Sequence, residues 1–183
     1  LFATSDVTLT GDMGGLSGAD GICDGLAASL PPTSAPLNEN YIALLSTSEL
    51  DARDRMGRGR YIRSTDGSIL SVGARWLFDG KNYPTTSHIM GYDESGDLIS
   101  GSVNIRTGTF NSGSKKNSST TPDSWCTNWT SADNSLTAGY GIGTRQSDDL
   151  WLRDTDFACD VMARIYCISD VFAKARPDVV PLT

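Results

Sequence analysis

The sequence is poor in the residues from which most active sites are built. It has one histidine, His88, and three glutamates among 183 residues. A single histidine cannot form a histidine-rich zinc site, and any Ser-His-Asp or Cys-His arrangement would depend on it. Its neighbours Ser87 and Ile89 form no nucleophile motif. We therefore expect no enzyme of these classes and no catalytic residues.

Long hydrophobic runs are also missing. The longest apolar run is residues 41–45, far below the roughly 18 residues that a membrane span needs. The net charge of −7 repels nucleic-acid backbones and sulfated polysaccharides. We expect neither nucleic acid as a partner nor direct insertion into a membrane.

The four cysteines are not arranged as the closely spaced C-x2-C pairs of zinc sites. A disulfide framework fits better than four reduced, buried thiols, although three pairings are open. A bond between Cys23 and Cys167 would tie the two ends together, and Cys126 with Cys159 would then close the second half. Disulfides persist in oxidising compartments, which predicts an exported protein, extracellular or on a cell surface.

Composition predicts one domain of short strands joined by turns, because 19 glycines accompany 38% hydrophobic and 20% charged residues. The domain is expected to span residues 1–170, with residues 171–183 as a C-terminal tail. The sequence opens at Leu1 and not at Met, which suggests a processed product whose upstream segment could mediate homo-oligomers.

Hydrophobic periodicity predicts few helices. A helix is expected over residues 16–28 with Ser17 as N-cap, and a short one from Ser48, its N-cap, to residue 56. The expected strands are residues 2–9, 41–46, 60–63, 98–99, 103–108, 150–152 and 163–169. Residues 66–149 are read as small strands and functional loops, 111–123 as irregular and 139–143 as turn-forming glycines.

Several motifs, in this order, resemble one bacterial family. They are Phe2-Ala3-Thr4-Ser5, Gly14-Gly15-Leu16-Ser17-Gly18-Ala19-Asp20, Leu45-Ser46-Thr47-Ser48, Tyr61-Ile62-Arg63, Arg106-Thr107-Gly108-Thr109, Cys126-Thr127-Asn128-Trp129-Thr130 and Ile165-Tyr166-Cys167. Together they cover nearly the whole chain, and the family is that of lectin-like, endostatin-like surface domains known from spirochaete outer-surface proteins.

The resemblance implies an α+β, C-type-lectin-like fold, in which two helices flank curled antiparallel sheets and a long loop region presents the binding surface. It also implies the pairings Cys23 to Cys167 and Cys126 to Cys159. The chain lacks the Glu-Pro-Asn, Gln-Pro-Asp and Trp-Asn-Asp motifs with which calcium-dependent lectins bind sugar.

Cofactors are therefore not expected, although the carboxylates before Cys159 leave a calcium site as an alternative. Those carboxylates belong to Asp148, Asp149, Asp154 and Asp156. The commoner explanation is a solvated acidic edge balanced by Arg145, Arg153 and Arg164.

The sequence predicts a non-catalytic adhesion or recognition domain that binds a glycan or an extracellular protein. Trp129 and Trp151 lie near expected disulfides and are assigned to the core. The candidate ligand-binding residues are Asp133, Asn134, Tyr140, Arg145 and Asp148. The alternatives are a secreted hydrolase using paired Asp residues and a structural capping or assembly module of a surface fibre.

Overall fold

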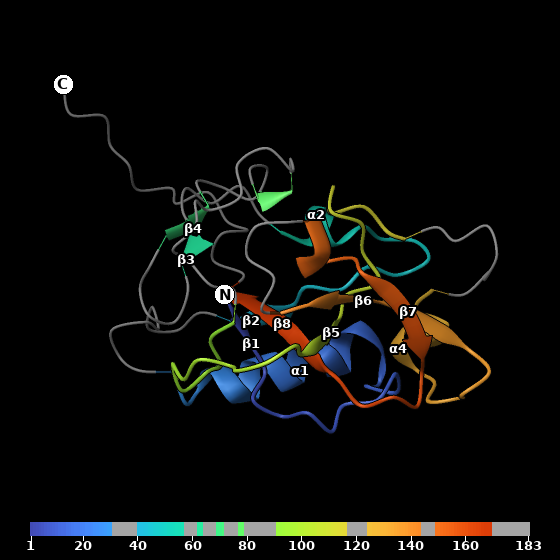
Figure 1. The fold of residues 1–183 in the computed structure, drawn as a ribbon, viewed down its shortest axis with the longest axis horizontal. Helices are drawn as coiled ribbons and strands as arrows, with labels where there is room; N and C mark the ends of the chain where they lie inside the picture. Colours follow the sequence, from blue (N-terminus) through green and yellow to red (C-terminus); the bar gives the residue numbers. More distant parts are fainter. Residues whose placement is uncertain are drawn as a thin grey trace.

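A computed structural model describes residues 1–30, 40–56, 62–63, 69–71, 77–78, 91–116, 124–143 and 149–169. The architecture is α+β, with few helices and a mixed, open sheet of six strands (Figure 1). Its helical elements are α1 (Gly15–Ala27), α2 (Ala52–Arg55), α4 (Cys126–Trp129) and the 3-10 helix η1 (Asp149–Trp151). Its strands are β1 (Phe2–Ala3), β2 (Tyr41–Ala43), β3 (Ile62–Arg63), β4 (Ile69–Ser71), β5 (Asn104–Arg106), β6 (Thr137–Ile142), β7 (Thr155–Ala158) and β8 (Arg164–Ser169).

The last strand, β8, is the centre of the main sheet. The sheet runs β1-β8-β5-β6-β7, with β2 also paired to β8, while β3 and β4 form a separate pair. Cys167 lies opposite both Phe2 of β1 and Ala43 of β2, whereas β5 runs parallel to the start of β8. The beginning of the chain is therefore hydrogen-bonded to its last described strand.

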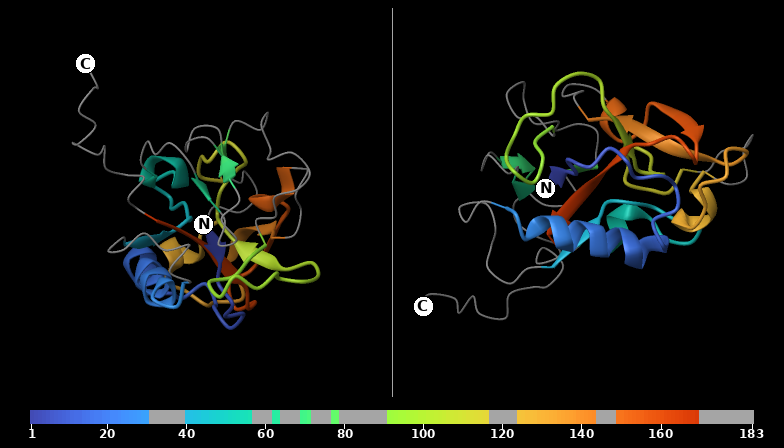
Figure 2. Two further views of the ribbon diagram at one scale, coloured as in Figure 1. Left: turned by 90° about the vertical axis from the view of Figure 1, so that its left-hand side faces the viewer. Right: turned by 90° about the horizontal axis from the view of Figure 1, so that it is seen from below.

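Two hydrophobic clusters cover β8, which explains why its four central residues, Ile165 to Ile168, are all apolar or aromatic. Cys167 and Ile165 belong to a cluster that includes Ala19 and Cys23 of α1. Tyr166 and Ile168 belong to a second cluster. Figures 1 and 2 show α1 lying along one side of the sheet.

Both expected disulfides are confirmed. Cys23 of α1 is bonded to Cys167 of β8, and Cys126 is bonded to Cys159. The first joins residues 144 apart in sequence and the second residues 33 apart. Crosslinks of this kind typically stabilise a domain by about 2–4 kcal/mol each.

Both predicted helix N-caps are wrong. The cap of α1 is Gly14, whose φ of 76° suits a glycine, and Ser17 lies inside the helix. The cap of α2 is Asp51, and Ser48 lies in a bend outside the helix, where its N–H donates to Asn128. Residues 150–152 are also not a strand, since η1 occupies Asp149–Trp151.

The strands expected at 2–9, 41–46 and 103–108 are in the right place but too long. The one expected at 98–99 is only an isolated bridge at Leu98, and β4, β6 and β7 were not predicted. β1 ends at Ala3, after which Leu9 makes an isolated bridge to Ala163. The glycines at 139 and 141 lie inside β6 and not in a turn. A Cβ on Gly141 would lie 1.9 Å from the carbonyl oxygen of Trp151, so glycine is needed there for close packing.

Candidate functional site

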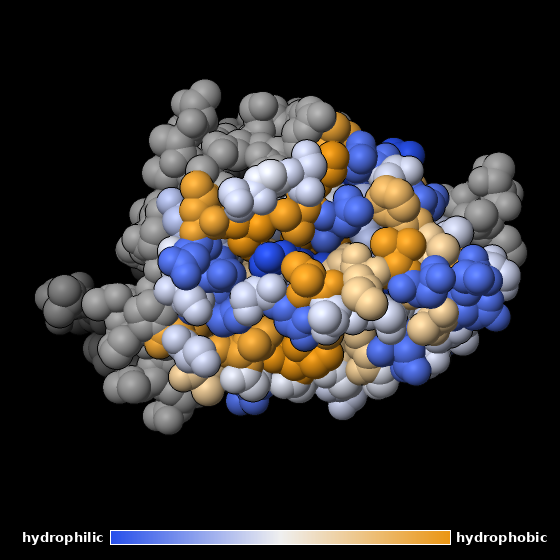
Figure 3. Space-filling view, turned by 60° about the horizontal axis from the view of Figure 1, so that its bottom comes forward, coloured by the Kyte–Doolittle hydropathy of each residue, from blue (hydrophilic) through white to orange (hydrophobic). Residues whose placement is uncertain are grey.

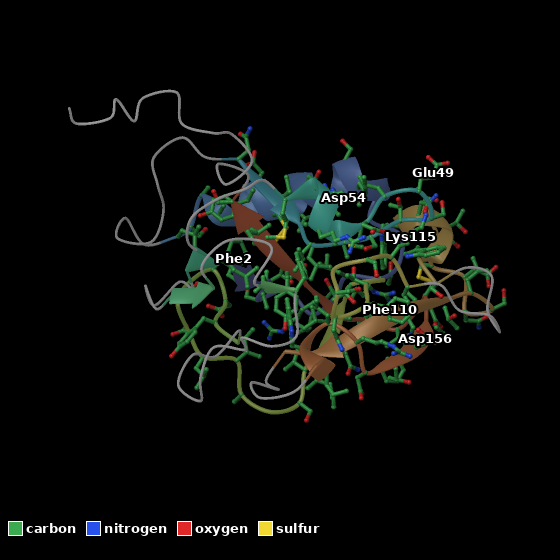
Figure 4. All side chains as sticks on the ribbon, turned by 90° about the horizontal axis from the view of Figure 1, so that it is seen from above. Phe2, Glu49, Asp54, Phe110, Lys115 and Asp156 are labelled. Carbon is green, nitrogen blue, oxygen red and sulfur yellow. A yellow bond between two sulfur atoms is a disulfide. The ribbon has the colours of Figure 1, made fainter. Side chains whose placement is uncertain are left out.

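Three segments contact one another above the sheet and carry both exposed and buried side chains: residues 48–54, 109–116 and 153–156. We call their outer surface the loop face. Figure 4 views it from above, with Glu49, Asp54, Lys115, Phe110 and Asp156 labelled on it. Glu49 and Asp54 are exposed, while Phe110 and Asp156 are half-buried. The face combines carboxylate, amide, hydroxyl, cationic and aromatic groups, which suits hydrogen bonding to a polar partner.

A left-handed turn supports the loop face from the side. Cys126, Thr127, Asn128 and Trp129 all have positive φ, between 50° and 68°. This conformation costs an L-residue roughly 1–2 kcal/mol and is normally visited singly. Four in succession persist only where surrounding contacts hold them, and such strain clusters at functional sites.

The contacts that hold the turn come from a disulfide and two indoles. Cys126 is bonded to Cys159. The Nε1 atoms of Trp125 and Trp129 donate to the carbonyls of Gly108 and Ser46, at 3.0 and 2.8 Å. Both indoles are buried, so each bond is protected from water.

The left-handed turn, through Asn128, and the segment 109–116, through Lys115, together fix Ser48. The backbone N–H of Ser48 donates to Oδ1 of Asn128 at 2.8 Å, and Nδ2 of Asn128 donates to the Ser48 hydroxyl at 3.0 Å. Nζ of Lys115 donates to the Ser48 carbonyl at 2.6 Å, and the backbone N–H of Lys115 donates to Oδ1 of Asp51 at 2.9 Å. The exposed loop after Ser46 is thus held from both sides.

Lys116 is a buried cation at the centre of the face. Its ammonium group pairs with Asp156 of β7. The stem passes over β6 at Gly139, where an added Cβ would lie 2.8 Å from Cδ of the lysine. A side chain at 139 would obstruct this path.

A second buried cation, Arg106, is the last residue of β5. It donates to the carbonyls of Cys159 and Val161, and its guanidinium lies 4.8 Å from the ring centre of Tyr140. Burial lowers the pKa of Arg106 below its usual value, yet an arginine stays charged in proteins. It therefore braces the backbone next to the disulfide at Cys159.

The expected ligand-binding residues are not gathered at the loop face. Asp133 and Asn134 are exposed in the turn before β6. Bonds to Asp133 from the N–H and hydroxyl of Ser135 lower the pKa of its carboxyl group. Tyr140 is buried with no exposed surface, so its assignment to an exposed site was wrong. Arg145 and Asp148 lie outside the described residues.

The side chains of the described residues form no metal-binding group of three or more His, Cys, Asp or Glu. Asp156, one of the suggested calcium ligands, is paired with Lys116, and Asp154 is exposed. The side chains of Asp148 and Asp149, and all of His88, are outside the described part. Within it, no helix could cross a membrane.

Sequence reasoning missed the residues that build the loop face. Ser48 was read as a helix cap, and Phe110 and Lys115 fell in or beside a segment read as irregular. The motif Cys126-Thr127-Asn128-Trp129-Thr130 was noticed, but nothing in it indicates a left-handed turn. No protein-family model matches the chain, and no curated protein sequence matches it.

Proposed function

We propose that this chain is an exported, non-catalytic recognition domain with a C-type-lectin-like fold, which binds a glycan or an extracellular protein through the loop face. The observation that carries the proposal is the support of this face. A strained left-handed turn, a disulfide and two buried indoles hold polar loops that carry exposed side chains, among them Ser48, Glu49 and Arg153. A preorganised surface loses little entropy on binding.

Two features favour the proposed fold and location. β1 pairs with β8, and Cys23 is bonded to Cys167, so the domain ends are tied together below a long loop region. Both disulfides are fully buried, and such bonds are typical of extracellular or cell-surface proteins.

The side that carries α1 is less suited to binding. Figure 3 shows the face at the bottom of Figure 1, where hydrophobic residues are interspersed with hydrophilic ones. Scattered apolar residues are normal for a solvent-exposed surface. The loop face, whose polar loops are held by the left-handed turn and the disulfide, is therefore the better candidate.

The test is a screen of the intact protein against a glycan array and immobilised matrix and serum proteins. The expected result is a saturable ligand. Binding should be lost in Glu49→Arg, on the loop face, and kept in Ser17→Arg, an exposed position on α1. No ligand in either screen, together with hydrolysis of a common glycan substrate, would favour the paired-Asp hydrolase instead.

A further inference from the structure

Arg153 differs from the other described cations of the molecule. Arg53 and Arg55 pair with Asp51 and Asp20, and Lys116 pairs with Asp156. The remaining cations whose side chains the structure describes donate to backbone carbonyls: Lys115, Arg106 and Arg164. Within the described part of the chain, Arg153 makes no hydrogen bond or ion pair.

The guanidinium of Arg153 is nevertheless held in place. It lies 4.7 Å from the ring centre of Phe110, a distance at which a cation is attracted to an aromatic face. Phe110 is fixed in turn, because its N–H donates to the carbonyl of Ser114 at 2.7 Å and its carbonyl accepts from Gly113 at 2.8 Å. Stacking leaves the N–H donors at the rim of the guanidinium free.

The two acids that follow Arg153 do not pair with it. Asp154 is exposed and forms no ion pair in the described structure, and Asp156 of β7 is already paired. Asp156 could neutralise a neighbouring arginine, but its carboxylate is bound by Lys116, which reaches it across Gly139. An exposed, ordered guanidinium thus remains unpaired on a protein of net charge −7.

We infer that Arg153, stacked on Phe110, is a subsite for the carboxylate of an acidic sugar, such as a hexuronic or sialic acid. A guanidinium binds a carboxylate through two parallel N–H bonds. The net negative charge disfavours polyanions, so the ligand carries isolated acidic residues. This inference rests on the proposed recognition function.

The experiment is calorimetric titration with a short acidic oligosaccharide, its carboxyl-reduced counterpart and an acidic peptide. The acidic sugar should bind, and its affinity should fall roughly tenfold or more in Arg153→Gln. Arg153→Lys should lose less, since it keeps charge but not bidentate geometry. Phe110→Leu, which keeps an apolar side chain but removes the ring, should also weaken binding. Ser17→Arg, an exposed substitution on α1 and outside the loop face, is the control and should bind normally.

Three outcomes would overturn the subsite. The reduced sugar could bind as well as the acidic one, Arg153→Gln could leave affinity unchanged, or only the peptide could depend on Arg153. In each case the recognition function survives if a ligand was found. If the screen finds no ligand of any kind, the recognition function itself is wrong. A ligand whose binding does not depend on Arg153 would contradict the subsite alone.

Discussion

Nη2 of Arg55 lies 2.7 and 2.6 Å from the two carboxylate oxygens of Asp20, joining α2 to α1. The same carboxylate accepts the N–H of Ala43 at 2.9 Å, and Asp24, one helical turn later, accepts that of Tyr41 at 3.1 Å. Asp20 and Asp24, one helical turn apart on α1, thus accept hydrogen bonds from two alternate residues of β2, Ala43 and Tyr41. Two acids of α1 cover backbone donors of β2 that would otherwise be open to another chain.

Asp20→Ala should destabilise the fold by about 3 kcal/mol, because it leaves a largely buried guanidinium without its partner. The side chain of Arg55 is 9% exposed, so water replaces little of the lost contact. Chemical denaturation measures the change. Asp54→Ala is the control, since this carboxylate is 63% exposed and 4.0 Å from Arg53, and it should change stability by less than about 0.5 kcal/mol. Equal effects would contradict the role of Asp20.

Two glycine substitutions should have opposite effects. Gly141→Ala should cost more than about 3 kcal/mol, because its Cβ would collide with the backbone at Trp151. Gly21→Ala, in α1 with nothing within 4 Å of the new atom, should stabilise the protein by up to about 1 kcal/mol. Thermal unfolding of both variants measures this, and a tolerated alanine at 141 would show that β6 and η1 are packed differently.

Removing the side chain of Thr127 from the left-handed turn should stabilise the protein. Thr127 has φ 54° and ψ 51°, which a glycine adopts without the clash of a Cβ. Thr127→Gly should therefore stabilise the protein by about 1 kcal/mol. Thr127→Ala keeps the Cβ and should bring no such gain, so the difference between the two variants isolates the backbone. A glycine variant less stable than the alanine variant would refute the turn.

Stability should fall at alkaline pH. Burial raises the pKa of Tyr140 to about 12 and also raises that of Tyr166. Unfolded tyrosines ionise near pH 10, so above that pH the unfolded state releases protons that the folded state retains. The stabilisation is complete below pH 10 and should decline from pH 10 to 12, by up to about 2 kcal/mol for Tyr140. Urea unfolding across this range, beside tyrosinate absorbance, tests it, and a flat profile would contradict the burial.

Tyr166 provides an internal check on this profile. Its hydroxyl is buried and has no hydrogen-bond partner in the described structure. Tyr166→Phe should therefore be neutral or stabilising at pH 7 and should make the alkaline decline shallower.

The sequence predicted those parts of the fold that depend on local pattern. Apolar spacing marked α1 through Ala19 and Cys23, both of which are buried. The continuous apolar run marked β8. Gly139 and Gly141 hid β6, because glycine usually weakens a strand, and here it is required by Lys116 and Trp151. Close approach by distant residues leaves no periodic signal in a sequence.

The candidate site was harder to predict for the same reason. Tyr140 between two glycines resembles an exposed loop aromatic, yet it stacks with Arg106 and contacts Phe157. Asn128 and Ser48 are 80 residues apart, and neither belongs to a pattern that indicates the other. Only the disulfide pairing, which the resemblance implied, gave a long-range constraint.

The central claim is that two disulfides hold the domain and its loop face. Its most direct test is peptide mapping of the unreduced protein by mass spectrometry. The account predicts one peptide pair joining Cys23 to Cys167, another joining Cys126 to Cys159, and no free thiol. Four free thiols, or bonds between other partners, would contradict both the support of the loop face and the exported location inferred from it.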